Sequence, residues 1–190
     1  MADRDVASEP GFSHSQHYIA DRVTAALDRI DVKSIARAVE LLDKAPQTFV
    51  YGAGRSGIIG RAFAMRLVQA GLRAYVIGES VTPIVRRGDA VFILSAQGES
   101  ASSNQTGNIV RREGAELIVL TSRGTSKLAH TATLLLVLDF PEDPERARLA
   151  PLGTLFEAGS LRLTDALVVE LMRARGESED SMRRRHAIMV

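Results

Sequence analysis

Cysteine and tryptophan are absent from this chain of 190 residues, and histidine occurs only four times. Without cysteine, disulfide bridges, thiolate zinc sites and a cysteine nucleophile are all excluded. Long apolar runs are missing as well, since none approaches the roughly 20 residues that a membrane-spanning helix needs. The polar residues 1–5 also do not resemble a signal peptide. We therefore predict a cytoplasmic protein with no membrane partner.

An excess of charge of either sign is also missing. The chain has 24 Lys and Arg against 23 Asp and Glu, for a formal net charge of +1, and carries no long basic stripe. This balance argues against a nucleic-acid-binding surface. A chain of this length fits a single domain, which can bury roughly 70% of its unfolded surface without needing a disulfide.

Two amphipathic helices are predicted before the first strand. Apolar residues recur with helical spacing over residues 15–30. Asp31 is the predicted N-cap of a second helix, which ends before Pro46. The polar residues 1–14 ahead of them predict a flexible N-terminal arm, and residues 15–190 a single domain that includes the C-terminal tail.

Strands and helices alternate after this point. Short apolar runs predict strands at residues 48–51, 73–77, 90–94, 117–120 and 134–138, and helices at 56–70, 102–113 and 154–175. Strands rich in Val, Ile and Leu without alternation are typical of a parallel sheet covered by helices on both faces. Thr82 and Pro83 predict the N-cap and first residue of a short helix ending near Gly88. The charged residues 140–150 predict an exposed loop.

Two loops stand out at the ends of predicted strands. The first carries Gly52, Gly54 and Gly57 and runs into a helix, whose N-terminus attracts anions. The second, residues 95–100, is rich in hydroxyl groups. Because ligands of parallel sheets bind at the carboxyl ends of the strands, we predict that both loops hold one phosphate of a sugar. The predicted binding residues of the two loops are Gly54, Arg55, Ser56, Ser95, Gln97, Gly98 and Ser100.

The first loop also matches the G-x-G-x-x-G dinucleotide fingerprint. Glu79, at the end of the second strand, stands where a ribose-binding acid would lie, and we include it among the predicted substrate-binding residues. Two helices before the first strand and a second, serine-rich loop favour a phosphate monoester over a dinucleotide. Tight turns that bind no ligand are the third interpretation.

Four segments carry a family resemblance. They are residues 52–57 (GAGRSG), 62–67 (AFAMRL), 78–83 (GESVTP) and 151–157 (PLGTLFE). With them, the chain resembles the 6-phospho-3-hexuloisomerases of the sugar isomerase (SIS) domain group. The resemblance implies a three-layer α/β/α sandwich around a five-stranded parallel, flavodoxin-like sheet. It also implies the interconversion of arabino-hex-3-ulose 6-phosphate and fructose 6-phosphate with no metal or other cofactor, in a tetramer whose sites lie near subunit interfaces.

The chain departs from that family at two places. Its second loop has Ala96, Gln97 and Ser100 where the family usually reads Ser-Gly-Ser-Gly-Glu-Thr, and the longer amide of Gln97 predicts weaker phosphate binding. Its last residues, Ile188, Met189 and Val190, replace the family's Asn-Leu-Glu.

Moving a carbonyl from C3 to C2 of a sugar requires one group that removes and returns a proton. Glu157 is the predicted base; the alternative is a capping box, in which Glu157 bonds back to the Thr154 backbone. His186 is the predicted proton shuttle or ring-opening acid, and a solvated tail residue is its alternative.

The histidines show no metal-ligand spacing with carboxylates, so we predict no metal. A sugar-phosphate sensor without activity and a nicotinamide oxidoreductase stay as competing classes.

Overall fold

A five-stranded parallel sheet forms the centre of the molecule. The computed structural model describes residues 11–188. The strands are β1 (Thr48–Gly52), β2 (Ala74–Val76), β3 (Ala90–Leu94), β4 (Glu116–Thr121) and β5 (Leu134–Val137), in the order β2-β1-β3-β4-β5. This is the flavodoxin-like order, in which the chain switches direction across the sheet between β1 and β3. The predicted parallel sheet is confirmed.

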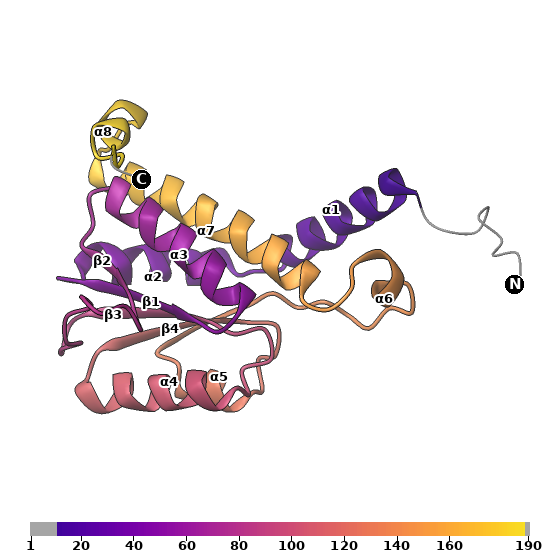
Figure 1. Cartoon of the computed structure of the whole chain (residues 1–190), viewed down its shortest axis with the longest axis horizontal. Helices are drawn as coiled ribbons and strands as arrows, with labels where there is room; N and C mark the ends of the chain where they lie inside the picture. The colour runs from indigo at the N-terminus through magenta and orange to yellow at the C-terminus, as the bar shows by residue number, and fades with distance from the viewer. Residues whose placement is uncertain (1–10, 189–190) are drawn as a thin grey trace, which may run out of the picture.

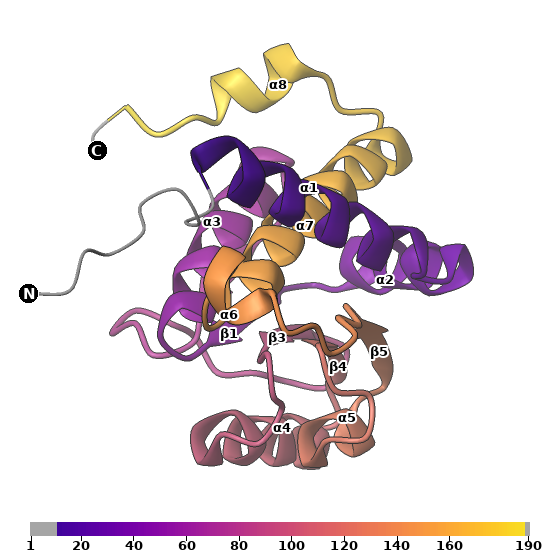
Figure 2. The ribbon, with the colours of Figure 1, turned by 90° about the vertical axis from the view of Figure 1, so that its right-hand side faces the viewer.

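Helices cover both faces of the sheet (Figures 1 and 2). On one face lie α1 (Phe12–Asp28), α2 (Val32–Lys44), α3 (Arg55–Gln69), α7 (Thr154–Arg175) and α8 (Glu179–Arg184), and on the other α4 (Ala101–Glu113) and α5 (Lys127–Thr131). A short helix, α6 (Arg146–Leu149), precedes α7. The three-layer sandwich with two N-terminal helices is therefore confirmed. None of the helices within residues 11–188 is both long and apolar enough to cross a membrane.

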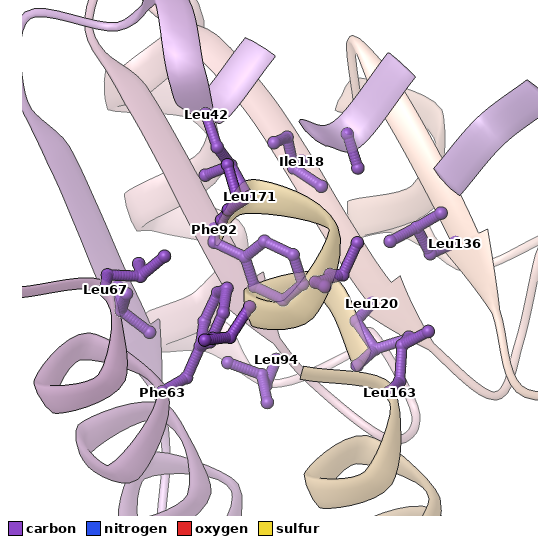
Figure 3. Packing of buried hydrophobic residues seen from close by; sticks show 14 of the residues in the cluster. Leu42, Phe63, Leu67, Phe92, Leu94, Ile118, Leu120, Leu136, Leu163 and Leu171 are labelled. Atoms are coloured by element: carbon purple, nitrogen blue, oxygen red, sulfur yellow. The ribbon is translucent and has the colours of Figure 1, made fainter. Parts of the chain in front are cut away.

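Alternate side chains of the strands supply two cores. Phe92 faces the larger core, where its ring meets that of Phe63 on α3 edge to face at 5.0 Å between centroids (Figure 3). Its neighbours Val91 and Ile93 face the smaller core under α4 and α5. Because β3 is buried on both faces, its five residues are all apolar, as the sequence pattern predicted.

Three local predictions differ from the structure. Helix α1 begins at Phe12, three residues before the predicted start, and residues 1–10 of the predicted arm lie outside the described residues. The helix predicted after Thr82 does not form, because the Thr82 hydroxyl donates to the Val76 carbonyl at 2.6 Å. The predicted loop 140–150 contains α6, where Leu149 and Ala150 are buried.

Candidate active site

The first loop makes a tight turn between β1 and α3. A Cβ on Gly57 would lie 2.5 Å from the Gly52 carbonyl oxygen, so no larger residue fits where the loop crosses itself. Helix α3 starts directly after Gly54, with Arg55 and Ser56 as its first two residues. The first N–H groups of a helix have no partner within it and carry its positive dipole end. The loop therefore presents an anion-binding helix terminus at the carboxyl edge of the sheet.

The second loop leaves the neighbouring strand at the same edge. Gly52 at the end of β1 pairs in register with Leu94 at the end of β3, so residues 53–57 and 95–100 start from adjacent strand tips. The Asn104 side chain donates to the carbonyls of Gly98 and Ser100, at 3.2 and 2.9 Å. These bonds fix the loop against the first turn of α4.

Helix α5 supports the second loop from its other side. A Cβ on Gly98, whose φ is +64°, would lie 2.1 Å from the Ser126 hydroxyl oxygen. The Glu99 carboxylate accepts a hydrogen bond from the Lys127 N–H at 3.1 Å, at the N-terminus of α5. Glu99, which is not among the residues predicted from the sequence, thus joins the loop to the next helix.

The hydroxyl groups of the second loop are not equivalent. Ser100 is the N-cap of α4: its Oγ accepts from the Ser103 N–H at 3.2 Å and donates to the Ser103 hydroxyl at 2.7 Å. Its hydroxyl is therefore already used within the protein. Ser95 is buried at the tip of β3, whereas Gln97 is exposed and lines a cavity.

Glu157 lies in the first turn of α7, with its side chain 12% exposed. The capping box does not form, because the Thr154 hydroxyl donates to the Pro151 carbonyl at 2.6 Å and the N-cap is Gly153. Instead, Oε2 of Glu157 lies 2.7 Å from Nη2 of Arg55, at the start of α3. This contact is an ion pair outside hydrogen-bond geometry, so within the described chain Oε2 accepts no hydrogen bond. The ion pair holds the carboxylate beside the first loop.

A cavity of about 410 Å³ opens between the second loop and α7. Its lining residues follow the ends of β3, β4 and β5, or belong to the segment before α7 and to the first turn of α7: Ala96, Gln97, Ser122, Arg123, Phe140, Glu142, Arg146, Leu152, Gly153, Leu155 and Phe156. Arg123 and Arg146 were not predicted from the sequence. Arg123 stands in the loop after β4 and Arg146 is the first residue of α6, and neither belongs to a recognisable motif.

Comparison with known proteins assigns the chain to a family. The family model described as the SIS domain matches residues 41–169, which include both loops and Glu157. The chain belongs to the SIS domain family.

Relatives of this SIS domain include named enzymes. A 3-hexulose-6-phosphate isomerase of Methylomonas aminofaciens is 30% identical over 174 residues, which cover 90% of this chain and 96% of the relative. One of Bacillus subtilis is 34% identical, covering 74% and 78% of the two chains. A crystal structure of a hypothetical protein has a TM-score of 0.88 at 34% identity and covers 92% of this chain and 95% of its own. These relatives confirm the predicted resemblance.

Two of the predicted site residues, Glu79 and His186, lie away from the two loops. Glu79 forms an ion pair with Arg61 and lines a different cavity of about 240 Å³ beside α3. His186 is exposed and lines a third cavity with Arg66 and Gln69, at the last turn of α3. Glu157 contacts the first residue of that helix, so about 20 Å of helix separates the two predicted catalytic residues within one chain.

The described residues contain no group of three or more His, Asp or Glu side chains arranged to hold a metal ion. The titratable side chains around the first loop and the cavity include those of Arg55, Glu142 and Glu157. Among them, Glu157 is the carboxylate that adjoins both the first loop and, through Gly153, the cavity.

Proposed function

We propose that this SIS domain interconverts arabino-hex-3-ulose 6-phosphate and fructose 6-phosphate. The observation that carries the proposal is the position of Glu157, a largely buried carboxylate held at the carboxyl edge of the sheet between the first loop and the cavity. The relatives named 3-hexulose-6-phosphate isomerase support the choice of substrate.

The two loops are the proposed phosphate site. The N-terminus of α3 supplies backbone N–H groups and the Ser56 hydroxyl, and the second loop supplies Ser95 and the Gln97 amide. Gly54, Gly98 and the Ser100 backbone shape these loops, and Arg55 adds a positive charge. Convergent donors of this kind suit a phosphate monoester, whose dianion accepts several hydrogen bonds.

Glu157 is the proposed base for both proton transfers. Its carboxylate removes the proton from C2 while the C3 carbonyl oxygen gains a proton, which gives a cis-enediol. The O2 hydroxyl then loses its proton, the C2 carbonyl forms, and the carboxylic acid returns its proton to C3. One carboxylate on one face of the enediol performs both carbon steps, and a second group moves the proton between the oxygens.

His186 is the proposed second group, supplied by another copy of the chain. Within one chain it lies at the far end of α3 from Glu157. A homo-oligomer, of which a tetramer is the form implied by the family resemblance, would bring the C-terminal segment of one subunit to the site of another. We also propose a cytoplasmic location, where sugar phosphates occur.

The substitution Glu157→Gln tests this function. We expect kcat to fall by about 10³-fold or more, because the amide cannot accept the proton, while fructose 6-phosphate still raises the melting temperature. The matched control is Glu170→Gln on the same helix, whose carboxylate pairs with Arg173 at the exposed surface. Kinetic and thermal-shift measurements with fructose 6-phosphate give both readouts.

Two outcomes would contradict the proposal. Full activity of the Glu157→Gln variant would remove the assigned base. Binding of fructose 6-phosphate by the wild type without any turnover would instead support the sugar-phosphate sensor.

A further inference from the structure

The cavity beside the second loop is lined by two arginines that the proposed phosphate site does not use. Arg123 follows β4 and Arg146 opens α6, and both line the same cavity of about 410 Å³. Glu142 is the one acidic residue among its lining residues. The side chains of Phe140, Leu155 and Phe156 supply apolar walls. A pocket of this size, with apolar walls and polar groups that can orient a ligand, suits a small molecule.

These two arginines differ from others close to them. Arg22 pairs with Asp143, and Arg55 pairs with Glu157. For Arg123 and Arg146, in contrast, residues 11–188 provide no ion pair or side-chain hydrogen bond to the guanidinium group. Two guanidinium groups without internal partners, on one cavity, are suited to bind an oxyanion bidentately.

The cavity adjoins the proposed catalytic site on two sides. Gln97 belongs both to the cavity and to the second loop. Gly153 lines the cavity and also touches Glu157, since a Cβ on Gly153 would lie 2.8 Å from Oε1 of that carboxylate. A sugar with C2 and C3 beside Glu157 and its C6 phosphate on the loops therefore has its C1 end next to this cavity.

We propose that Arg123 and Arg146 form a second anion subsite, which binds the C1 phosphate of a ketose bisphosphate. The inference rests on the proposed function, because that function places C1 here. Fructose 1,6-bisphosphate then binds across both subsites and competes with the monophosphate substrate. Phosphorylation of the proposed product on its free primary hydroxyl gives this ligand, so the subsite makes the enzyme sensitive to the reaction that consumes its product.

The double substitution Arg123→Gln/Arg146→Gln tests the subsite. We expect the inhibition constant for fructose 1,6-bisphosphate to rise at least about tenfold, since two charged hydrogen-bonding groups are lost. The KM for fructose 6-phosphate should stay within about twofold, because the monophosphate leaves the subsite empty. The matched control is Arg73→Gln, an exposed arginine at the amino edge of the sheet. It should change neither constant.

Calorimetric titration with fructose 1,6-bisphosphate separates this proposal from the proposed function. Bisphosphate binding that weakens tenfold in the double variant supports the subsite even if no turnover is detected. Turnover with bisphosphate binding unchanged by the double variant overturns the subsite and leaves the function standing. If the double variant raises the KM for fructose 6-phosphate as much as the inhibition constant, the subsite is also overturned. The two arginines would then bind the C6 phosphate.

Discussion

At the scale of single residues, the site depends on how closely Gly153 approaches Glu157. Gly153 precedes α7 with φ −88° and ψ 7°, a conformation open to residues other than glycine. Its hydrogen in place of a methyl group nevertheless leaves room for the carboxylate, because a Cβ would lie 2.8 Å from Oε1. The glycine therefore sets the position of the proposed base.

The substitution Gly153→Ala should lower kcat by about 10- to 100-fold, since a shift of about 1 Å in a catalytic group has an effect of this size. The melting temperature should change little, because the backbone conformation suits alanine. Steady-state kinetics and circular dichroism measure the two effects. Gly11→Ala is the control, since a Cβ there would have no neighbour within 4 Å. Unchanged kcat in Gly153→Ala would show that the carboxylate is not held where we describe it.

The sequence predicted the glycine turn of the first loop and Glu157, because both stand in local motifs. It predicted Glu157 as the base with a capping box as the alternative, and the ion pair with Arg55, which stands far earlier in the chain, is not visible in the local motif. Arg123 and Arg146 could not be found at all. Folding alone brings the ends of β4 and α6 to one cavity.

At the scale of elements, helices begin and end at the capping residues seen in the sequence, except where a capping side chain forms a different hydrogen bond. Asp31 caps α2 as predicted, and α7 ends at the predicted residue 175, directly before Gly176 with φ +65°. The helix predicted from Thr82 and Pro83 does not form, because the threonine hydroxyl donates to the carbonyl of Val76 instead of accepting from a helix N–H. The Val76 carbonyl belongs to the preceding strand β2, so the sequence of the Thr-Pro pair alone does not reveal this hydrogen bond.

The C-terminal segment is attached to the body of the molecule through Arg185, whose guanidinium group is held by Glu177. The Glu177 carboxylate accepts from Arg185 at 2.7 and 2.9 Å, and Arg185 also donates to the Gln69 carbonyl at the end of α3 at 3.0 Å. The hydrogen bond from Arg185, and next that from Ser181, lower the pKa of Glu177 from 4.5 to about 2. A carboxyl whose pKa is lower in the folded state stabilises that state above its unfolded pKa.

The free energy of unfolding should therefore contain a contribution from Glu177 that is present above pH 4.5 and disappears as the pH falls towards 2. The variant Glu177→Gln should be less stable than the wild type at pH 7, and the difference should shrink across that interval. Urea unfolding at several pH values measures it. The control Glu179→Gln removes an 84% exposed carboxylate and should have little effect. A difference independent of pH would show that the Glu177 charge is not responsible.

At the scale of the whole molecule, the sheet order explains why two distant glycine and serine loops meet. The strands β1 and β3 are neighbours although β2 lies between them in sequence, so their loops flank the switch point (Figure 1). The near-continuous apolar strands allowed this architecture to be predicted. The position of the C-terminal segment could not be predicted, because it depends on long-range contacts such as that of Arg185 with α3.

The same architecture separates the two proposed catalytic residues. Glu157 lies at the first residue of α3 and His186 near its last turn, so one chain cannot bring both to one substrate. If each site takes Glu157 from one subunit and His186 from another, a variant that lacks one of these residues can still supply the other. Mixed oligomers of the two variants then contain some sites with both residues.

We therefore expect Glu157→Gln and His186→Ala to be inactive alone and to regain activity when their subunits are mixed. Random mixing of equal amounts should restore about a quarter of the wild-type activity, because each shared site draws its two residues from independent chains. The test is to unfold and refold the two variants together, and to compare the product with each variant refolded alone. Light scattering should give a mass about four times the 20.6 kDa of one chain. Full activity of His186→Ala alone would remove the histidine from the mechanism, and a monomeric mass for the active enzyme would exclude the shared site.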